Sequence, residues 1–417
     1  MIIHRNITQN LLQALIDNPV VLLNGARQTG KSTLVQSKEL GERDYLTFDD
    51  IGLLAAAKGD PNGFISGLGN AVTLDEVQHV PELFPAIKLA VDRDRKAGRF
   101  LLTGSANVML LPKLSESLAG RMELLALWPF SHGEIQGIRE TFIDNFFSDK
   151  PLWPSAKERA SFNRSKLIDL MLTGGYPLVV ARQSLARRRA WLDSYLTTIL
   201  QRDVRELSNI DGLSVVPRLL SVVASRAGGL LNYADLSRNL ALPQTTLKRY
   251  FALLQRTFLV KLLPPWSGNI GQRNIRTPKV YFGDSGLLAH LLGLTAQRLE
   301  VDQSLAGALV ENFVTMELLK QSTWSETKPS LFFWRTASGR EVDIVIEDRE
   351  GRIVGIEVKA AGTLNRADTV GLRAMAEEIG SKWVRGVVLY MGTDVIPFSR
   401  NLHAVPLQTL WSRFNGR

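Results

Sequence analysis

The sequence contains no cysteine, only five histidines and no apolar run long enough to cross a bilayer. The lack of cysteine excludes disulfides, thiolate zinc sites and cysteine nucleophiles, so a metal would need oxygen or imidazole ligands. With so few histidines, we expect Mg²⁺ bound by carboxylates and phosphates. The start of the chain also lacks the long apolar segment of a secretory signal. We therefore expect a cytoplasmic protein without a membrane partner.

The composition is otherwise that of an ordinary folded protein. Of 417 residues, 45% are hydrophobic and 22% are charged. A chain of this length is expected to hold roughly two to four domains. The formal net charge of +9 is compatible with a nucleic-acid partner and equally with a basic soluble surface, so charge alone does not decide between them.

A glycine-rich segment follows a short apolar strand predicted at residues 19–24. Residues 25–32 read GARQTGKS and match G-x-x-x-x-G-K-[ST], and residues 32–40 predict the helix that should follow. In such a loop the backbone N–H groups surround phosphates, the lysine reaches the β- and γ-phosphates, and the serine hydroxyl binds Mg²⁺. We predict that ATP is held by Gly25, Ala26, Arg27, Gln28, Thr29, Gly30, Lys31, Ser32 and Thr33.

Three further strands are predicted at residues 44–49, 71–74 and 99–103, with helical patterns between them. Alternation of this kind indicates an α/β fold with a mainly parallel sheet. The strand at 71–74 ends in two adjacent carboxylates. We predict that Asp75 binds the magnesium and that Glu76 is the general base for ATP hydrolysis, since an acid pair there indicates hydrolysis rather than storage of nucleotide.

Two more residues are candidates for the same catalytic site. Ser105 follows the strand at 99–103 and could contact the γ-phosphate or the attacking water. Arg121, in the segment LAGR, could stabilise transition-state charge in its own subunit or in a neighbour. An ordinary turn and an ordinary surface cation are the alternatives for these two positions.

Residues 213–262 predict three short helices and a strand, an arrangement that resembles a winged helix-turn-helix. In the third helix the apolar side chains share one stripe, and Gln244, Thr245, Lys248 and Arg249 lie at its exposed start. Such a helix places its first polar residues against base edges in DNA. The alternative is a module that only contacts protein.

Near the C-terminus, residues 341–346 and 353–359 predict a pair of adjacent strands. Strand alternation should place Val342, Ile344 and Ile346 on the face opposite Asp343. Glu357 and Lys359 share a face, so Asp343, Glu357 and Lys359 should meet at one end of a sheet. Two carboxylates can bind Mg²⁺ there, and a lysine can position or activate water for phosphodiester attack.

This pattern resembles the restriction-endonuclease-like fold, in which an Asp is followed by (Asp/Glu)-x-Lys on the next strand. The resemblance implies that Asp343 and Glu357 bind metal, with Glu311 on the preceding helix as an additional acid. An exposed Glu–Lys pair, or a nuclease fold that only binds its partner, remains the alternative.

An ordered set of segments extends the resemblance to most of the chain. GARQTGKST, LDEVQ, LLTGSA, LAGR and GGYP together resemble a bacterial and archaeal family of AAA-type ATPases with a C-terminal domain of unknown function. The resemblance implies a core of the ASCE class, in which the acid pair lies one strand away from the P-loop strand. It also implies a homo-oligomer.

We therefore expect an α/β chain in four parts: a P-loop ATPase core (1–135), a helical lid (136–212), a winged-helix-like module (213–275) and a restriction-endonuclease-like domain (276–417). The first hypothesis for its function is Mg²⁺-dependent ATP hydrolysis coupled to a DNA-directed activity of the last domain. The second is an ATP-dependent switch that binds DNA or a protein partner and cleaves nothing. In a third, the last domain is an assembly module.

Overall fold

The computed structural model describes residues 2–104, 116–148, 163–204, 215–273 and 277–412. It divides into two compact units. Unit 1 comprises Met1–Pro129 with Arg256–Phe258, and unit 2 comprises Phe130–Gln255 with Leu259–Arg417. In the described part of the chain, no helix is both long and apolar enough to span a membrane.

Unit 1 contains a five-stranded sheet in the order β2-β3-β4-β1-β5, and every neighbouring pair is parallel. Its strands are β1 (Val20–Gly25), β2 (Asp44–Thr47), β3 (Val72–Asp75), β4 (Phe100–Gly104) and β5 (Met122–Leu127). Strand β4 separates β3 from β1, which confirms the expected ASCE arrangement with the acid pair one strand away from the P-loop strand.

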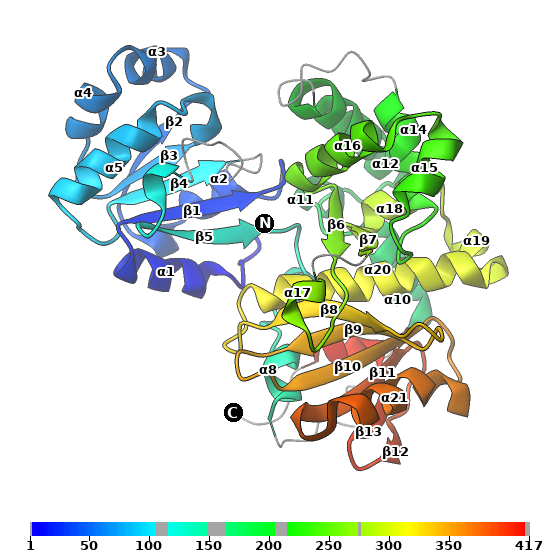
Figure 1. Ribbon diagram of the computed structural model, residues 1–417. Helices are drawn as coiled ribbons and strands as arrows, with labels where there is room; N and C mark the ends of the chain where they lie inside the picture. The colour runs from blue at the N-terminus through cyan, green and yellow to red at the C-terminus, as the bar shows by residue number, and fades with distance from the viewer. Residues whose placement is uncertain (1, 105–115, 149–162, 205–214, 274–276, 413–417) are drawn as a thin grey trace. The chain divides into compact units, whose positions relative to one another are not determined.

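Helices cover both faces of this sheet (Figure 1) because its central strands are apolar on both sides. In β1, Val20 and Leu22 pack into one cluster while Val21 and Leu23 pack into the other, as the two-residue period of a strand requires. The helices are α1 (Thr8–Asp17), α2 (Lys31–Val35), α3 (Ile51–Gly59), α4 (Pro61–Ser66) and α5 (Leu83–Arg93).

The predicted strands of unit 1 are all present, and two details differ. Strand β5 was not expected from the sequence, where Glu123 interrupts its apolar pattern. The helix predicted at 32–40 ends at Val35, and a short 3-10 turn, Lys38–Leu40, follows. Ser37 between them has an extended backbone, so the helix cannot continue through it.

Unit 2 begins with a helical region followed by a small sheet. The helices are α7 (His132–Gln136), α8 (Phe142–Phe146), α10 (Arg164–Thr173), α11 (Pro177–Val180), α12 (Leu185–Thr198), α14 (Val216–Ala224), α15 (Tyr233–Leu240) and α16 (Gln244–Arg256). The strands β6 (Val260–Leu263) and β7 (Lys279–Phe282) then pair antiparallel. The exposed start of α16 carries the four polar residues predicted there, and the winged-helix interpretation stays a prediction.

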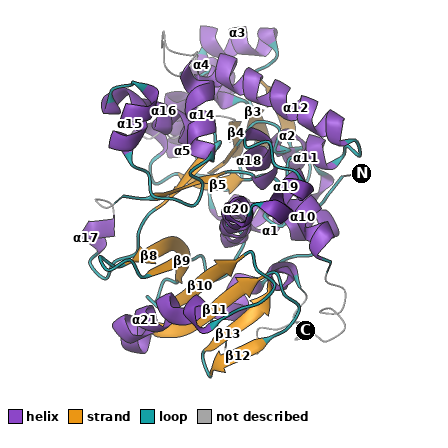
Figure 2. Cartoon of the chain, turned by 90° about the vertical axis from the view of Figure 1, so that its right-hand side faces the viewer, coloured by secondary structure: helices purple, strands orange, loops and turns teal. Residues whose placement is uncertain are grey.

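The second half of unit 2 is a six-stranded sheet in the order β12-β13-β11-β10-β9-β8 (Figure 2). Its strands are β8 (Ser330–Arg335), β9 (Glu341–Glu347), β10 (Ile353–Lys359), β11 (Trp383–Tyr390), β12 (Ile396–Ser399) and β13 (Leu402–Pro406). The remaining helices of the unit are α17 (Ile270–Arg273), α18 (Ser285–Leu291), α19 (Ala296–Val301), α20 (Gln303–Ser322) and α21 (Val370–Ile379).

Alternate residues of the sheet's central strands belong to two apolar clusters. Val387 and Leu389 of β11 join the cluster that contains Leu309 of α20, whereas Val388 joins the one that contains Leu372 of α21. The sheet is therefore covered by α20 on one face and by α21 on the other. Fully burying an aliphatic side chain of this kind contributes about 1.5–3 kcal/mol.

A bulge in β9 overturns one prediction about this sheet. Ile344 and Ile346 lie in the α20 cluster, but Val342 lies in the α21 cluster, so the expectation that all three share a face is wrong. Between the pairs Phe332↔Val345 and Trp334↔Val342 the register shifts, and β9 contains one residue more than β8. A bulge of this type breaks the alternation and redirects the side chains beside it, here next to Asp343.

Candidate functional site

The glycine-rich loop connects the buried strand β1 to helix α2. Gly25 has no room for a side chain, because a Cβ there would lie 2.2 Å from the carbonyl oxygen of Leu127 on β5. Gly30 has φ +91°, a left-handed conformation that favours glycine. Both glycines of the motif are thus required by the backbone, and they let the loop turn sharply before α2.

Internal hydrogen bonds hold this loop in its shape. The Thr29 hydroxyl donates to the carbonyl oxygen of Ala26 at 2.9 Å, and Arg5 donates to the carbonyl oxygen of Thr29 at 2.7 Å. Lys31 is buried, and its Nζ donates to the carbonyl oxygens of Gly25 at 3.1 Å and Ala26 at 2.8 Å. The ammonium group therefore lies along the concave backbone where phosphates are expected to bind.

Asp75, at the end of β3, is the centre of a group of hydroxyls. The Ser32 hydroxyl donates to its Oδ2 at 2.8 Å, the Tyr45 hydroxyl donates at 2.5 Å, and the Thr103 hydroxyl donates to Oδ1. Burial and the Asp75 carboxylate raise the pKa of Tyr45 to about 12, which keeps this phenol protonated as a donor. The strand order β3-β4-β1 brings Ser32 and Asp75 together.

These two oxygens fit a magnesium shell. Mg²⁺ binds oxygen at about 2.1 Å in an octahedron, so neighbouring ligands lie about 3 Å apart. The observed separation of 2.8 Å between the Ser32 Oγ and the Asp75 Oδ2 is close to that value. Ser32 and Asp75 would hold the ion together with phosphate oxygens, and the ion would supply positive charge to the phosphates.

Glu76 has the left-handed backbone conformation, with φ +59°. This conformation is uncommon for a residue other than glycine, and such strained positions cluster at functional sites. Its backbone N–H donates to the Thr103 hydroxyl at 3.3 Å, and its carboxylate accepts a hydrogen bond from the Gln78 side chain. Gln78 was not predicted, although it belongs to the segment LDEVQ. The predicted role of Glu76 as general base remains untested.

Of the other two catalytic candidates of unit 1, the structure describes Arg121 but not Ser105. Ser105 lies outside the described residues. Arg121 is bound by Asp92, with Nε 2.6 Å from Oδ1 and a second hydrogen bond of 3.0 Å. This ion pair holds the guanidinium beside α5, and the predicted role in stabilising transition-state charge stays a prediction.

A second group of charged residues lies in unit 2, where β9 and β10 meet α20. The predicted residues are brought together: Lys359 donates to Glu357 at 2.8 Å, and the Val358 N–H donates to Asp343 at 2.9 Å. Burial and the charge of Asp343 raise the pKa of Glu357 to about 8 and of Glu311 to about 7. Burial and the charge of Asp343 thus disfavour further negative charge at this position.

Three members of this group were missed from the sequence: Lys279 and Tyr281 on β7, and Glu341 on β9. The Lys279 Nζ lies 2.9 Å from Glu311, 2.5 Å from Glu341 and 3.4 Å from Asp343. The Tyr281 hydroxyl donates to Glu311 at 2.7 Å. Lys279 and Tyr281 are two positions apart on one strand, so the sequence could have predicted that they share a face. Nothing in the sequence indicates that β7 lies next to β9. We call Lys279, Glu311, Glu341 and Asp343 the Lys279 cluster.

The Lys279 cluster does not fit a metal ion as it stands. Among the described residues, no three His, Cys, Asp or Glu side chains are placed to hold one. An ammonium group lies between the carboxylates instead, and burial, which lowers the pKa of Lys279, is outweighed by the neighbouring Tyr281 and carboxylates that raise it. The prediction that Asp343, Glu357 and Glu311 bind Mg²⁺ stays a prediction.

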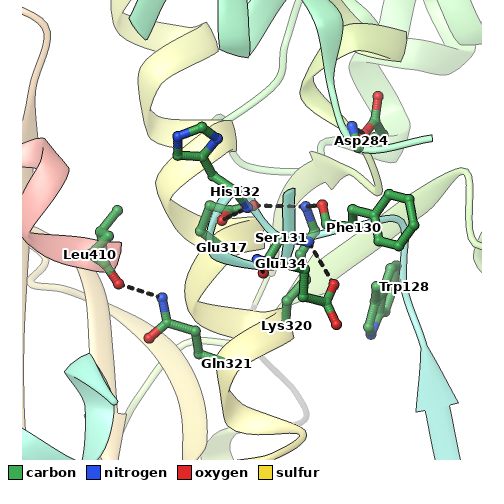
Figure 3. Close-up of polar contacts among 12 residues, drawn as sticks. Trp128, Phe130, Ser131, His132, Glu134, Asp284, Glu317, Lys320, Gln321 and Leu410 are labelled. Atoms are coloured by element: carbon green, nitrogen blue, oxygen red, sulfur yellow. Dashed lines mark hydrogen bonds and ion pairs between the residues drawn. The ribbon is translucent and has the colours of Figure 1, made fainter. Parts of the chain in front are cut away.

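Helix α20, which carries Glu311 of the Lys279 cluster, also bonds to the start of unit 2 through Glu317 and Lys320 (Figure 3). Lys320, on the same helix as Glu311, donates to the carbonyl oxygen of Phe130 at 2.9 Å and to Glu317 at 2.8 Å. Glu317 also accepts the N–H of His132 at 2.8 Å. One rigid helix thus holds both the start of unit 2 and one acid of the Lys279 cluster.

Comparison with known families agrees with this geometry. Residues 17–136 match the model of an AAA domain, residues 164–298 match a domain of unknown function (DUF8612), and residues 306–410 match a domain of unknown function (DUF4143). The fold and the loop thus define an ATPase domain of the AAA type, followed by regions of unknown function.

An uncharacterized protein of Mycobacterium tuberculosis, Rv2008c, is 34% identical over 409 residues, which cover 97% of this chain and 84% of that protein. An uncharacterized protein of Haemophilus influenzae is 22% identical over 353 residues. The chain belongs to the family represented by the mycobacterial protein, a family of AAA-type ATPases with a C-terminal domain of unknown function.

Solved structures resemble the chain only distantly. A Walker-type ATPase of Pyrococcus abyssi has a TM-score of 0.43 and 17% identity, covering 70% of this chain and 96% of its own. The Holliday junction branch migration motor RuvB of Thermotoga maritima has a TM-score of 0.30 and 18% identity, covering 63% of this chain and 90% of its own. These likenesses carry no argument about function.

Proposed function

We propose that unit 1 binds ATP with Mg²⁺ and hydrolyses it. In this proposal the loop at 25–33 holds the phosphates, and Lys31 exchanges its backbone carbonyl partners for phosphate oxygens. Ser32 and Asp75 hold the ion, and Glu76 takes a proton from the attacking water. The observation that carries the proposal is the hydrogen bond between Ser32 and Asp75, which joins the two predicted magnesium ligands at 2.8 Å.

The magnesium part of this proposal is tested with Asp75→Asn. We expect this variant to bind ATP in EDTA as the unchanged protein does, but to lose most of the gain in affinity that Mg²⁺ provides. Isothermal titration with and without Mg²⁺ measures both values. Asp44→Asn, which changes an exposed acid on β2, is the matched control. Equal Mg²⁺ dependence in the two variants would remove Asp75 from the site.

We further propose that ATP turnover in unit 1 is coupled to a nucleic-acid-directed activity of unit 2. Two features support this: the restriction-endonuclease-like signature of Asp343, Glu357 and Lys359, and the contacts among these residues. The exposed polar start of α16 supplies a surface for DNA, and the net charge of +9 favours a polyanion.

The decisive experiment is a cleavage assay on linear and supercoiled DNA with Mg²⁺ or Mn²⁺, with and without ATP. Asp343→Ala and Lys359→Ala should each abolish any cleavage, and cleavage that survives both would remove this site from the proposal. DNA titrations at several salt concentrations measure binding separately, because phosphate contacts give a steep salt dependence.

The alternative function is an ATP-dependent switch that binds DNA or a protein partner and cuts nothing. One observation favours it, namely the ammonium of Lys279 among the carboxylates that a nuclease would need for metal. Protein that binds DNA in an ATP-dependent manner but never cleaves it would select this alternative. The four-part division of the chain, the homo-oligomer and the cytoplasmic location remain parts of our proposal.

A further inference from the structure

The position of Lys279 is unusual for a lysine. It is the first residue of β7, and its side chain is only 3% exposed. A charged lysine is almost never buried unless it is paired, because removing an ammonium from water costs several kcal/mol. At Lys279 that cost is offset by three carboxylates, contributed by Glu311 of α20 and by Glu341 and Asp343 of β9.

The surroundings of Lys279 leave little room for a second cation. The ammonium lies within hydrogen-bonding distance of Glu311 and Glu341, and within 3.4 Å of Asp343. Gly228 closes one side, since a Cβ on it would lie 3.0 Å from the Glu311 carboxylate. The Phe333 ring lies 5.7 Å from the Lys279 Nζ. A divalent ion bound by the same oxygens would stand a few ångströms from this ammonium, where two positive charges repel strongly.

The remaining acid, Glu357, pairs with Lys359 through its Oε1 only, since its buried Oε2 has no hydrogen-bond partner among the described residues. Lys359 lies 2.8 Å from Glu357 and 4.0 Å from Asp368, which precedes α21. Lys359 therefore forms an ion pair with Glu357, as the predicted signature requires, while Lys279 forms ion pairs with Glu311, Glu341 and Asp343. Lys279 is the member of the group that the nuclease-like pattern does not account for.

We propose that Lys279 is a built-in counter-ion that closes the Lys279 cluster to divalent cations, so that a cation enters only when Lys279 is withdrawn. This inference rests on the proposed function, in which the residues around Asp343 carry the activity of unit 2. It adds a mechanism by which that site is regulated. Lys279 and a divalent ion compete for the same carboxylates.

The strand that carries Lys279 is bound on both of its sides. Strand β7 pairs with β6, where Lys279 is opposite Leu263, and Lys279 also bridges Leu230 on the other side. The backbone of the following residue, Val280, bonds to Gly228 and Gly229 after α14. Backbone hydrogen bonds thus join the strand that carries Lys279 to the segment that follows α14.

The test measures Mn²⁺ binding directly, without ATP or DNA, by electron paramagnetic resonance of free Mn²⁺. All proteins carry Asp75→Asn, so that the P-loop contributes no ion site. We expect Lys279→Met to gain one Mn²⁺ site per chain, with at least about tenfold higher affinity than the parent, a difference of about 1.4 kcal/mol. Adding Asp343→Asn to Lys279→Met should abolish the gain.

Lys261→Met is the matched control, because Lys261 lies on β6 of the same pair and burial lowers its pKa. This variant should gain no Mn²⁺ site. Circular dichroism and thermal unfolding establish that each variant is folded, and Lys279→Gln replaces Lys279→Met if the latter does not fold.

Two results would overturn the proposal. One is a folded Lys279→Met or Lys279→Gln variant that gains no Mn²⁺ site. The other concerns the parent: if it binds Mn²⁺ as tightly as the variants do, at a site that Asp343→Asn removes, then Lys279 excludes nothing. Because neither result depends on hydrolysis or cleavage, a protein without nuclease activity would remove the nuclease hypothesis while leaving the competition between Lys279 and the cation intact.

Discussion

The two sites of this protein use the same residue types in opposite ways. In unit 1, the buried Lys31 donates to neutral carbonyl oxygens, and Asp75 accepts from neutral hydroxyls. In unit 2, the buried Lys279 meets carboxylates directly. The carbonyl and hydroxyl groups in these contacts of the first site carry no net charge, whereas the carboxylates of the second site neutralise the ammonium of Lys279. We infer that the first site is arranged for binding and that the second is held closed.

The largest effect that this comparison predicts is the loss of ATP binding in Lys31→Ala. A charged hydrogen-bonding group of this kind contributes about 1.5–3 kcal/mol, so we expect ATP affinity to fall by roughly 10- to 100-fold or more. Titration with a fluorescent ATP analogue measures the affinity. Lys38→Ala, on an exposed turn, is the control, and unchanged affinity in Lys31→Ala would break the comparison.

Glu76→Gln separates binding from chemistry in unit 1. The amide keeps the size of the side chain but cannot accept a proton, so ATP should still bind while turnover falls by about 100-fold or more. Phosphate release under saturating ATP measures turnover. Glu42→Gln changes an exposed acid nearby and should have no effect. Normal turnover in Glu76→Gln would show that another group is the base.

In unit 2 the comparison predicts losses of stability instead. Lys320→Met leaves Glu317, which is 1% exposed, without its ion-pair partner. Breaking a buried pair in this way costs about 3–5 kcal/mol. Denaturant unfolding should detect this cost, and Lys382→Met, at an exposed position, should be neutral. Adding Glu317→Gln should recover part of the loss, and no recovery would mean that Lys320 acts through packing alone.

The buried carboxyl of Glu140 should make the free energy of unfolding depend on pH. Burial, together with the charge of Glu317, raises its pKa to about 8. The folded protein therefore holds a proton that the unfolded chain releases, and stability is lost as pH rises from about 4.5 toward 8, at up to about 1.4 kcal/mol per pH unit. Glu140→Gln stays neutral and should lose this dependence.

Melting temperatures from pH 5 to 9 test the prediction for Glu140. The difference between Glu140→Gln and the unchanged protein should grow with pH in favour of the variant. Glu350→Gln, at an exposed turn, should follow the unchanged protein throughout. Parallel curves for Glu140→Gln and the unchanged protein would mean that Glu140 is ionised across this range.

The smallest effects come from a matched pair of tyrosines, one in each site. Tyr281→Phe removes the hydrogen bond to Glu311 in a fully buried position, and we expect it to cost about 1 kcal/mol. Tyr45→Phe removes one of several hydroxyl donors to Asp75 and should cost less. Denaturant unfolding of the two variants compares them directly, and the reverse order of costs would contradict the distinction between the sites.

Many elements of this protein could be predicted from short segments of its sequence. The segment from β1 through the glycine-rich loop to α2 is continuous, so its motif specifies both shape and ligand. Strand β10 was predicted at its observed bounds, 353–359, because apolar alternation and the turn before it act over a few residues. The contact between Asp343 and the next strand also followed from short-range pairing.

The remaining features depend on which elements become neighbours. Ser32 and Asp75 are 43 positions apart, and only the parallel order β3-β4-β1 joins them. The bulge beside Asp343, which moves Val342 to the other face, depends on how β9 pairs with β8. Strand β5 was missed because its burial comes from β1 rather than from its own pattern.

The sequence by itself determined the chemistry of the loop at Gly25–Ser32, since these eight adjacent residues contain all the groups that bind a phosphate. Only the tertiary structure decided that Lys279 lies among Glu311, Glu341 and Asp343. Charge interactions depend on distance in space, and β7, β9 and α20 are separate in the chain, so no local pattern of residues could reveal that the carboxylates already have their cation.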